Sequence, residues 1–165
     1  MRRCLLAGIV LSIAFALTPA SAQEWPTRTI RVIIPLTAGA ATDIMARAVF
    51  EQVSQQVGQP FIVENRPGAG NTIGMAAVAN AEPDGYTILA NSSTHTVSPA
   101  TRSKLPFNVL TDLSGVIPLG NMPVVMAVNP KKGYKTLADF VNYARKNPGA
   151  INYASAGVGT SGFLA

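Results

Sequence analysis

The strongest constraint on the fold is an alternation of strand and helix patterns between residues 29 and 90. Residues 29–35 are mostly β-branched and apolar, which is typical of a strand covered on both faces. From Thr42 the apolar residues adopt a helical period, and Gly58 and Pro60 end that helix. The predicted buried face of this helix consists of Ile44, Met45, Ala48, Val49, Val53 and Val57. A strand over 61–64, a helix over 72–81 and a strand over 86–90 complete two right-handed βαβ units, so the predicted fold class is α/β with a mostly parallel sheet.

The remainder of the chain is less regular. Strands are expected over 116–119, 124–129 and 151–154, and a helix over 136–147 with a capping box formed by Thr136 and Asp139. A strand, a small-residue turn and a Thr or Ser helix start occur at 29–43 and again at 151–161. The chain ends at Ala165, only a few residues into the last expected helix. We therefore expect it to be truncated at its C-terminus.

The first 22 residues have the three-part layout of a secretory signal peptide. Two arginines precede an apolar run over residues 5–17, and small residues before Gln23 predict cleavage after Ala22. Cleavage would remove the only cysteine, Cys4, which is consistent with an oxidising compartment such as the periplasm. The 13 Lys and Arg against 8 Asp and Glu form no basic block and do not alternate with aromatic residues, so no nucleic-acid partner is expected.

The two small-residue turns, at 37–41 and 155–161, are the candidate binding sites. A helix that starts after such a turn presents unpaired backbone N–H groups, and these accept an anion without any lysine or arginine. Neither turn contains a P-loop or a G-x-G-x-x-G motif, so nucleotide binding is disfavoured. The alternative is that both turns are ordinary connections between strand and helix.

The sequence gives little support for a catalytic site or a metal-binding site. His95 is the only histidine, no G-x-S-x-G motif occurs, and no cofactor or metal is expected. We interpret His95 as a polar loop residue that could hydrogen-bond a ligand. The carboxylates Asp43, Glu64, Asp84 and Asp112 lack paired spacing, and Asp43 is expected to complement a helix dipole. Arg66 could bind an anion or donate to loop carbonyls.

Several motifs in succession point to a family. They are Val63-Glu64-Asn65-Arg66-Pro67-Gly68-Ala69-Gly70, Pro83-Asp84-Gly85-Tyr86-Thr87, Pro148-Gly149 and Tyr153-Ala154-Ser155-Ala156-Gly157-Val158-Gly159. In this order they resemble the Bug-type extracytoplasmic solute receptors, which are the binding proteins of tripartite tricarboxylate transporters.

The resemblance implies a type II periplasmic-binding-protein-like fold, in which two α/β lobes close around a small organic carboxylate. Residues 23–121 would form the first lobe, without its returning C-terminal part, and 122–165 the start of a second, incomplete lobe. The implied partners are membrane transporter subunits, and the receptor would be a monomer and not an enzyme. The resemblance maps ligand-binding positions onto Thr37, Ala38, Gly39, Ala40, Thr42, Asp43, Ser92, Thr94, His95, Ala156, Gly157, Gly159, Thr160 and Ser161.

Three departures from the family pattern stand out. Ala40 replaces the second glycine of the first turn, Phe163 replaces a histidine after the second turn, and the chain has about half the family's length. Two alternative functions remain open from the residues. One is a ligand-sensing partner of a two-component system, and the other is an exported hydrolase that would need His95 beside a serine.

Overall fold

A three-stranded parallel sheet forms the centre of the structure. The computed structural model describes residues 24–155 and 160–164, so the predicted signal peptide and its cleavage site lie outside the described residues. Strands β1 (Ile30–Ile34), β2 (Phe61–Asn65) and β3 (Thr87–Leu89) are ordered β2-β1-β3. The central strand pairs in parallel with both neighbours, from Ile30↔Phe61 on one side and from Arg31↔Thr87 on the other. The predicted α/β class with a parallel sheet is therefore confirmed.

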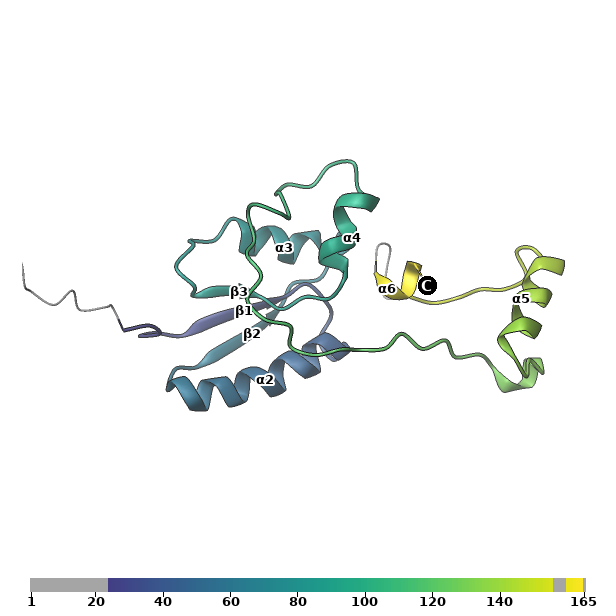
Figure 1. Cartoon of the computed structure of the whole chain (residues 1–165), viewed down its shortest axis with the longest axis horizontal. Coiled ribbons are helices and arrows are strands. Elements are labelled where there is room, and N and C mark those ends of the chain that lie inside the picture. The colour runs from purple at the N-terminus through teal and green to yellow at the C-terminus, as the bar shows by residue number, and fades with distance from the viewer. Residues whose placement is uncertain (1–23, 156–159, 165) are drawn as a thin grey trace, which may run out of the picture.

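Two helices cover opposite faces of this sheet (Figure 1). Helix α2 (Ala41–Val57) packs on the face that carries Val32 and Ile34, and its Ala46 joins their buried cluster. Helix α3 (Thr72–Ala79) lies over β1 and β3, where Met75 packs with residues 105–113. This layering, with one helix on each face of a parallel sheet, is the arrangement of two consecutive βαβ units that the sequence pattern predicts.

The predicted extent of α2 is confirmed, but its predicted buried face is only partly right: Met45, Val49 and Val53 are half-buried, and the other three residues are exposed. Gly58 ends the helix in the left-handed conformation, with φ of +71°. Ile44 is 62% exposed, and Ala48 and Val57 are exposed as well. The helix instead packs through Ala46, whose small side chain permits close approach to the strands, and through Phe50, which stacks on Phe61 at 5.2 Å between ring centroids. Asp43, also on the buried side of α2, accepts hydrogen bonds from Gly39 in the preceding turn and from Asn65 at the end of β2.

Helix α4 (Thr94–Thr101) follows β3 and was not predicted. His95 therefore lies in the first turn of a helix, which corrects its interpretation as a loop residue. The sequence pattern did not predict this helix because it contains Pro99, and an internal proline ordinarily breaks a helix. Because proline has no N–H, Pro99 leaves the His95 carbonyl without its usual bond within the helix.

The strands expected over 116–119, 124–129 and 151–154 are absent from the described residues. These segments are extended but pair with no other strand, and Val116 and Val125 are 89% and 80% exposed. The segment 116–129 passes α2, where Leu119 packs on the core, and then leads away from the sheet (Figure 1). A β-type sequence forms a strand only when another backbone edge is available, and no such edge reaches these segments.

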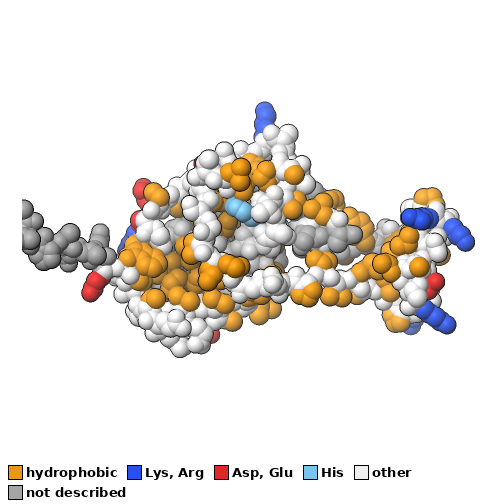
Figure 2. Space-filling model, viewed as in Figure 1, with side chains coloured by type: hydrophobic (Ala, Val, Ile, Leu, Met, Phe, Trp, Pro, Cys, Tyr) orange, Lys and Arg blue, Asp and Glu red, His pale blue; other side chains and the backbone are white. Residues whose placement is uncertain are grey.

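The segment leads to η1 (Pro130–Lys132), α5 (Leu137–Lys146) and finally α6 (Ser161–Leu164). The predicted capping box is confirmed: Thr136 accepts from the Asp139 amide at 3.1 Å, and Asp139 accepts from the Thr136 amide at 3.0 Å. The apolar side of α5 is not buried, since Leu137 is 64% exposed. Hydrophobic side chains lie at the surface between the sheet and α5 (Figure 2). Within the described residues, no helix combines the length and apolar character needed to span a bilayer.

Candidate functional site

The turn between β1 and α2 forms the start of a helix at the carboxyl end of the central strand. Gly39 has φ of +83°, and the Ala40 amide donates to the Thr37 carbonyl at 3.2 Å. Ala40 itself is in the extended region, with φ of −63° and ψ of 153°. Alanine adopts this conformation without strain, so the departure from a Gly-Gly pair leaves the turn intact. The turn predicted from the sequence is thus formed.

The first amides of α2 are available as donors. In the described part of the chain, the N–H groups of Ala41, Thr42 and Asp43 have no hydrogen-bond acceptor. These groups carry the positive end of a helix of 17 residues. An anionic group could therefore bind at this end without any positively charged side chain.

Asp43 is directed into the turn and is only 3% exposed. Its carboxylate accepts from the Gly39 amide at 2.8 Å, from Arg47 Nε at 3.0 Å and from Asn65 Nδ2 at 3.0 Å. The backbone bond from Gly39, followed by the bond from Arg47, lowers the pKa of Asp43 from 3.8 to about 2. Asp43 therefore acts as an internal anion that holds the turn closed, and it occupies the Gly39 amide that the sequence interpretation assigned to a ligand.

Asn65 and Arg47 complete this network, and sequence reasoning missed both. Asn65 ends β2 and donates to the Leu36 carbonyl at 3.0 Å as well as to Asp43. Arg47 Nη2 donates to Asn65 Oδ1 at 2.9 Å. Two signals in the sequence could have found them: Asp43 and Arg47 are spaced i, i+4 on a helix, and Asn65 ends the strand paired with β1.

The segment after β3 holds Ser92, Thr94 and His95. Because β3 is parallel to β1 and beside it, this segment lies at the same edge of the sheet as the β1–α2 turn. Ser92 Oγ and Thr94 Oγ1 are 3.2 Å apart, and Thr94 is fully buried. Three buried polar atoms near strand ends lack a partner in the described structure: Asn71 Nδ2, Asn91 Nδ2 and His95 Nδ1. The His95 ring makes no described hydrogen bond to a serine, which is the contact that a hydrolase would require.

The second predicted turn is described only in part. Ala156, Gly157 and Gly159 lie outside the described residues. Thr160 is buried, and its carbonyl accepts from the amides of Phe163 and Leu164 at the start of α6, where Ser161 is the first residue. A helix therefore begins at the predicted position, and the approach of the two turns stays a prediction.

Asp84 and Glu64 pair with arginine side chains of the same chain. Asp84 accepts from the Tyr86 amide at 2.9 Å and pairs with Arg28 at 2.7 Å, which confirms its role in a turn. Arg66 pairs with Glu64 at 2.9 Å, so the anion that its guanidinium binds is a side chain of the same protein. No group of three or more His, Cys, Asp or Glu in the described residues could hold a metal ion.

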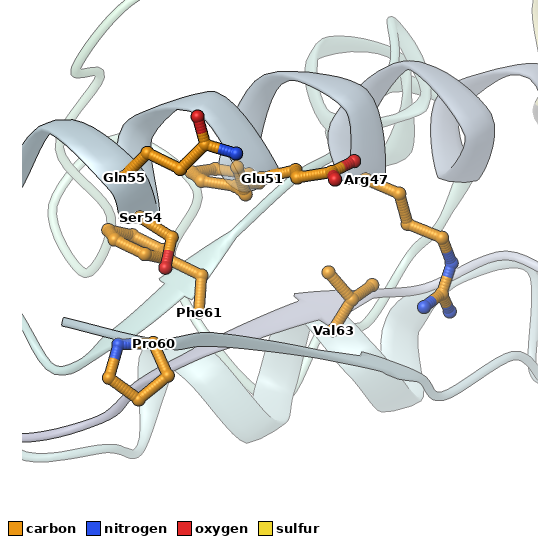
Figure 3. Close-up of a pocket in the computed structure, with 8 residues that line it drawn as sticks. Arg47, Glu51, Ser54, Gln55, Pro60, Phe61 and Val63 are labelled. Atoms are coloured by element: carbon orange, nitrogen blue, oxygen red, sulfur yellow. The ribbon is translucent and has the colours of Figure 1, made fainter. Parts of the chain in front are cut away.

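A shallow hollow of about 420 Å³ lies between α2 and β2 (Figure 3). Its lining includes Arg47, Phe50, Phe61 and Val63, and none of the predicted ligand-binding residues. Figure 3 shows Arg47 at one end of this hollow, with its guanidinium extended toward the β2 side. The hollow is thus separate from the helix start that offers free amides.

Comparison with known proteins identifies the family. Residues 45–165 match the family described as the tripartite tricarboxylate transporter family receptor (TctC). The chain belongs to this family. Its TctC membership confirms the resemblance found in the sequence motifs.

Individual relatives agree with this assignment. The chain is 35% identical to the protein BugT of Bordetella pertussis over 95% of its own length and 49% of the relative's. Among solved structures, R. palustris Rpa4515 with adipate is 30% identical with a TM-score of 0.80, covering 86% of this chain and 48% of the other. MatC from Rhodopseudomonas palustris with bound malate is 33% identical with a TM-score of 0.67, over 73% and 42% of the two chains. The chain thus spans about half the length of the relatives it matches.

Proposed function

We propose that this chain carries the ligand-capturing first lobe of a periplasmic receptor, which delivers a small organic carboxylate to the membrane subunits of a tripartite-type transporter. Residues 23–121 form that lobe and residues 122–165 begin the second. The receptor is exported by a signal peptide cleaved after Ala22, and it works as a monomer.

The observation that carries this proposal is the start of α2. Its amides at Ala41 and Thr42 are free, they sit at the carboxyl end of the central strand, and the β3–α4 segment with Thr94 and His95 follows the neighbouring strand. In open parallel sheets, ligands bind at this edge. The likeness to structures that hold adipate and malate supports a carboxylate as the ligand.

Binding is tested with the protein encoded by the longest natural reading frame that contains this sequence. Adipate, malate and citrate are titrated one at a time while the melting temperature is followed. A carboxylate that binds the folded state raises the melting temperature as its concentration passes the Kd. The neutral diamide of adipate is the control, and it is expected to have no effect. Failure of adipate, malate and citrate alike to shift the melting temperature would contradict the proposal.

One substitution removes a single donor and keeps the helix. Proline is tolerated at the first position of a helix, and Ala40 already has the extended backbone that a following proline requires. Ala41→Pro deletes the Ala41 N–H, so the Kd for the carboxylate should rise by roughly tenfold or more, as expected for a lost hydrogen bond to a charged group. Ala41→Ser keeps the N–H and is the matched control. Equal affinity in the two variants would exclude this amide as a donor.

A further inference from the structure

We infer that Arg47 is a positioning residue for anion capture: it neutralises the buried Asp43 carboxylate, so that a second, exchangeable carboxylate can bind beside it. The inference rests on the proposed function. The inference assigns a role to a residue that makes no contact with the ligand but sets the net charge beside the free amides at the start of α2.

The starting point is an electrostatic conflict. Asp43 is 3% exposed and ionised, and it is the third residue of α2, within one helical turn of the free Ala41 and Thr42 amides. A ligand carboxylate at those amides would lie close to a buried negative charge. Like charges at such a separation repel strongly unless a counter-charge lies near.

Arg47 supplies the counter-charge from the solvent side. Its Nε is 3.0 Å from Asp43 Oδ1, and about half of its side chain is exposed. Its Nη2 donates to Asn65 Oδ1, which fixes the guanidinium while Asn65 Nδ2 binds both Asp43 and the Leu36 carbonyl. The guanidinium is held in place at both ends, so Asp43 can brace the turn through Gly39 without repelling the ligand.

The same geometry separates this role from simple structural support. If Arg47 only held the turn together, removing both charges would damage binding at least as much as removing one. If Arg47 compensates for Asp43, then removing Arg47 alone exposes the negative charge, whereas removing both charges restores neutrality. When Asp43→Asn is combined with Arg47→Gln, the asparagine side-chain carbonyl can still accept from Gly39, and its amide can donate to the glutamine side-chain carbonyl. Asn65 Nδ2 loses its acceptor at residue 43 and keeps its bond to the Leu36 carbonyl.

The test measures the Kd of adipate and malate by calorimetry at low and at high salt. It uses the protein encoded by the longest natural reading frame that contains this sequence. Arg47→Gln should raise the Kd about tenfold at low salt and less at high salt, because salt partly screens the repulsion between the uncompensated Asp43 carboxylate and the ligand. Arg47→Lys keeps the charge and should stay within about threefold of the unsubstituted protein. The double variant D43N/R47Q should recover most of the affinity lost in R47Q.

The outcomes separate this inference from the proposed function. Absence of carboxylate binding in the unsubstituted protein would refute the proposed function. Binding that is retained in R47Q, or a double variant that binds worse than R47Q, would overturn the inference alone. Melting curves confirm that each variant is folded at the assay temperature. Arg47→Met, which keeps the apolar stem beside Val63, provides the same charge removal if R47Q does not fold.

Discussion

The buried carboxylate of Asp43 gives the sharpest test of how the turn is held. We expect Asp43→Asn to lower the free energy of unfolding by about 2 kcal/mol at pH 7, since the difference between a pKa of 3.8 and one of about 2 corresponds to that energy. The bonds from Gly39 and Arg47 supply it: both are shorter than 3.1 Å, and both favour the ionised form.

The sign of the pH dependence follows from the lowered pKa. Folding lowers the pKa of Asp43, so its contribution is complete above the unfolded-state value of 3.8 and is lost as the pH falls toward 2. About half of the contribution should be gone at pH 3. The stability difference between the unsubstituted protein and D43N should therefore shrink between pH 4 and pH 2.

Urea unfolding followed by circular dichroism at a series of pH values measures this difference. Asp84→Asn is the matched control: Asp84 also accepts from a backbone amide and pairs with an arginine, but its side chain is 39% exposed. Its removal should cost less than about 1 kcal/mol. A D43N protein as stable as the unsubstituted one at pH 7, or a difference that does not change between pH 4 and pH 2, would refute the assignment of Asp43 as the internal anion of the turn.

Three further predictions concern packing and local structure. Gly74→Ala should destabilise the protein by roughly 1–3 kcal/mol in urea, because the new Cβ would lie 2.7 Å from Pro35 Cβ and 2.9 Å from the Arg66 carbonyl oxygen; Gly115→Ala meets nothing within 4 Å and should be neutral. Thr136→Ala removes one half of the capping box and should reduce the stability of α5 by about 1 kcal/mol, seen as faster amide exchange in its first turn, whereas Thr136→Ser should retain it. The 165-residue chain on its own should bind the dye ANS, because Leu110, Val116 and Val125 are at least 80% exposed; a chain that melts cooperatively and leaves the dye unbound would contradict this.

Local sequence patterns predicted correctly those features that depend on residues close together in the chain. The β-branched run of β1, the left-handed glycine that ends α2 and the capping box of α5 follow from propensity and spacing, and all three are present. The motifs that include Asn65 and Arg66 also identified the family before any geometry was known. In each case the residues that carry the information are close together in the chain.

Tertiary structure decided what depends on distant partners. Leucine and valine patterns predicted strands near residues 116 and 124, but a strand exists only where a second backbone edge meets it. In α2, the carboxylate of Asp43 turns inward and accepts from Gly39 and Asn65, whereas Ile44 is exposed. The sequence by itself determined that a helix starts after β1 with free amides. Only the fold brought Asn65, 22 residues away along the chain, into contact with Asp43. Pairing of parallel strands joins residues that no local pattern connects, and for this reason the assignment of Asp43 as an internal anion had to come from the structure.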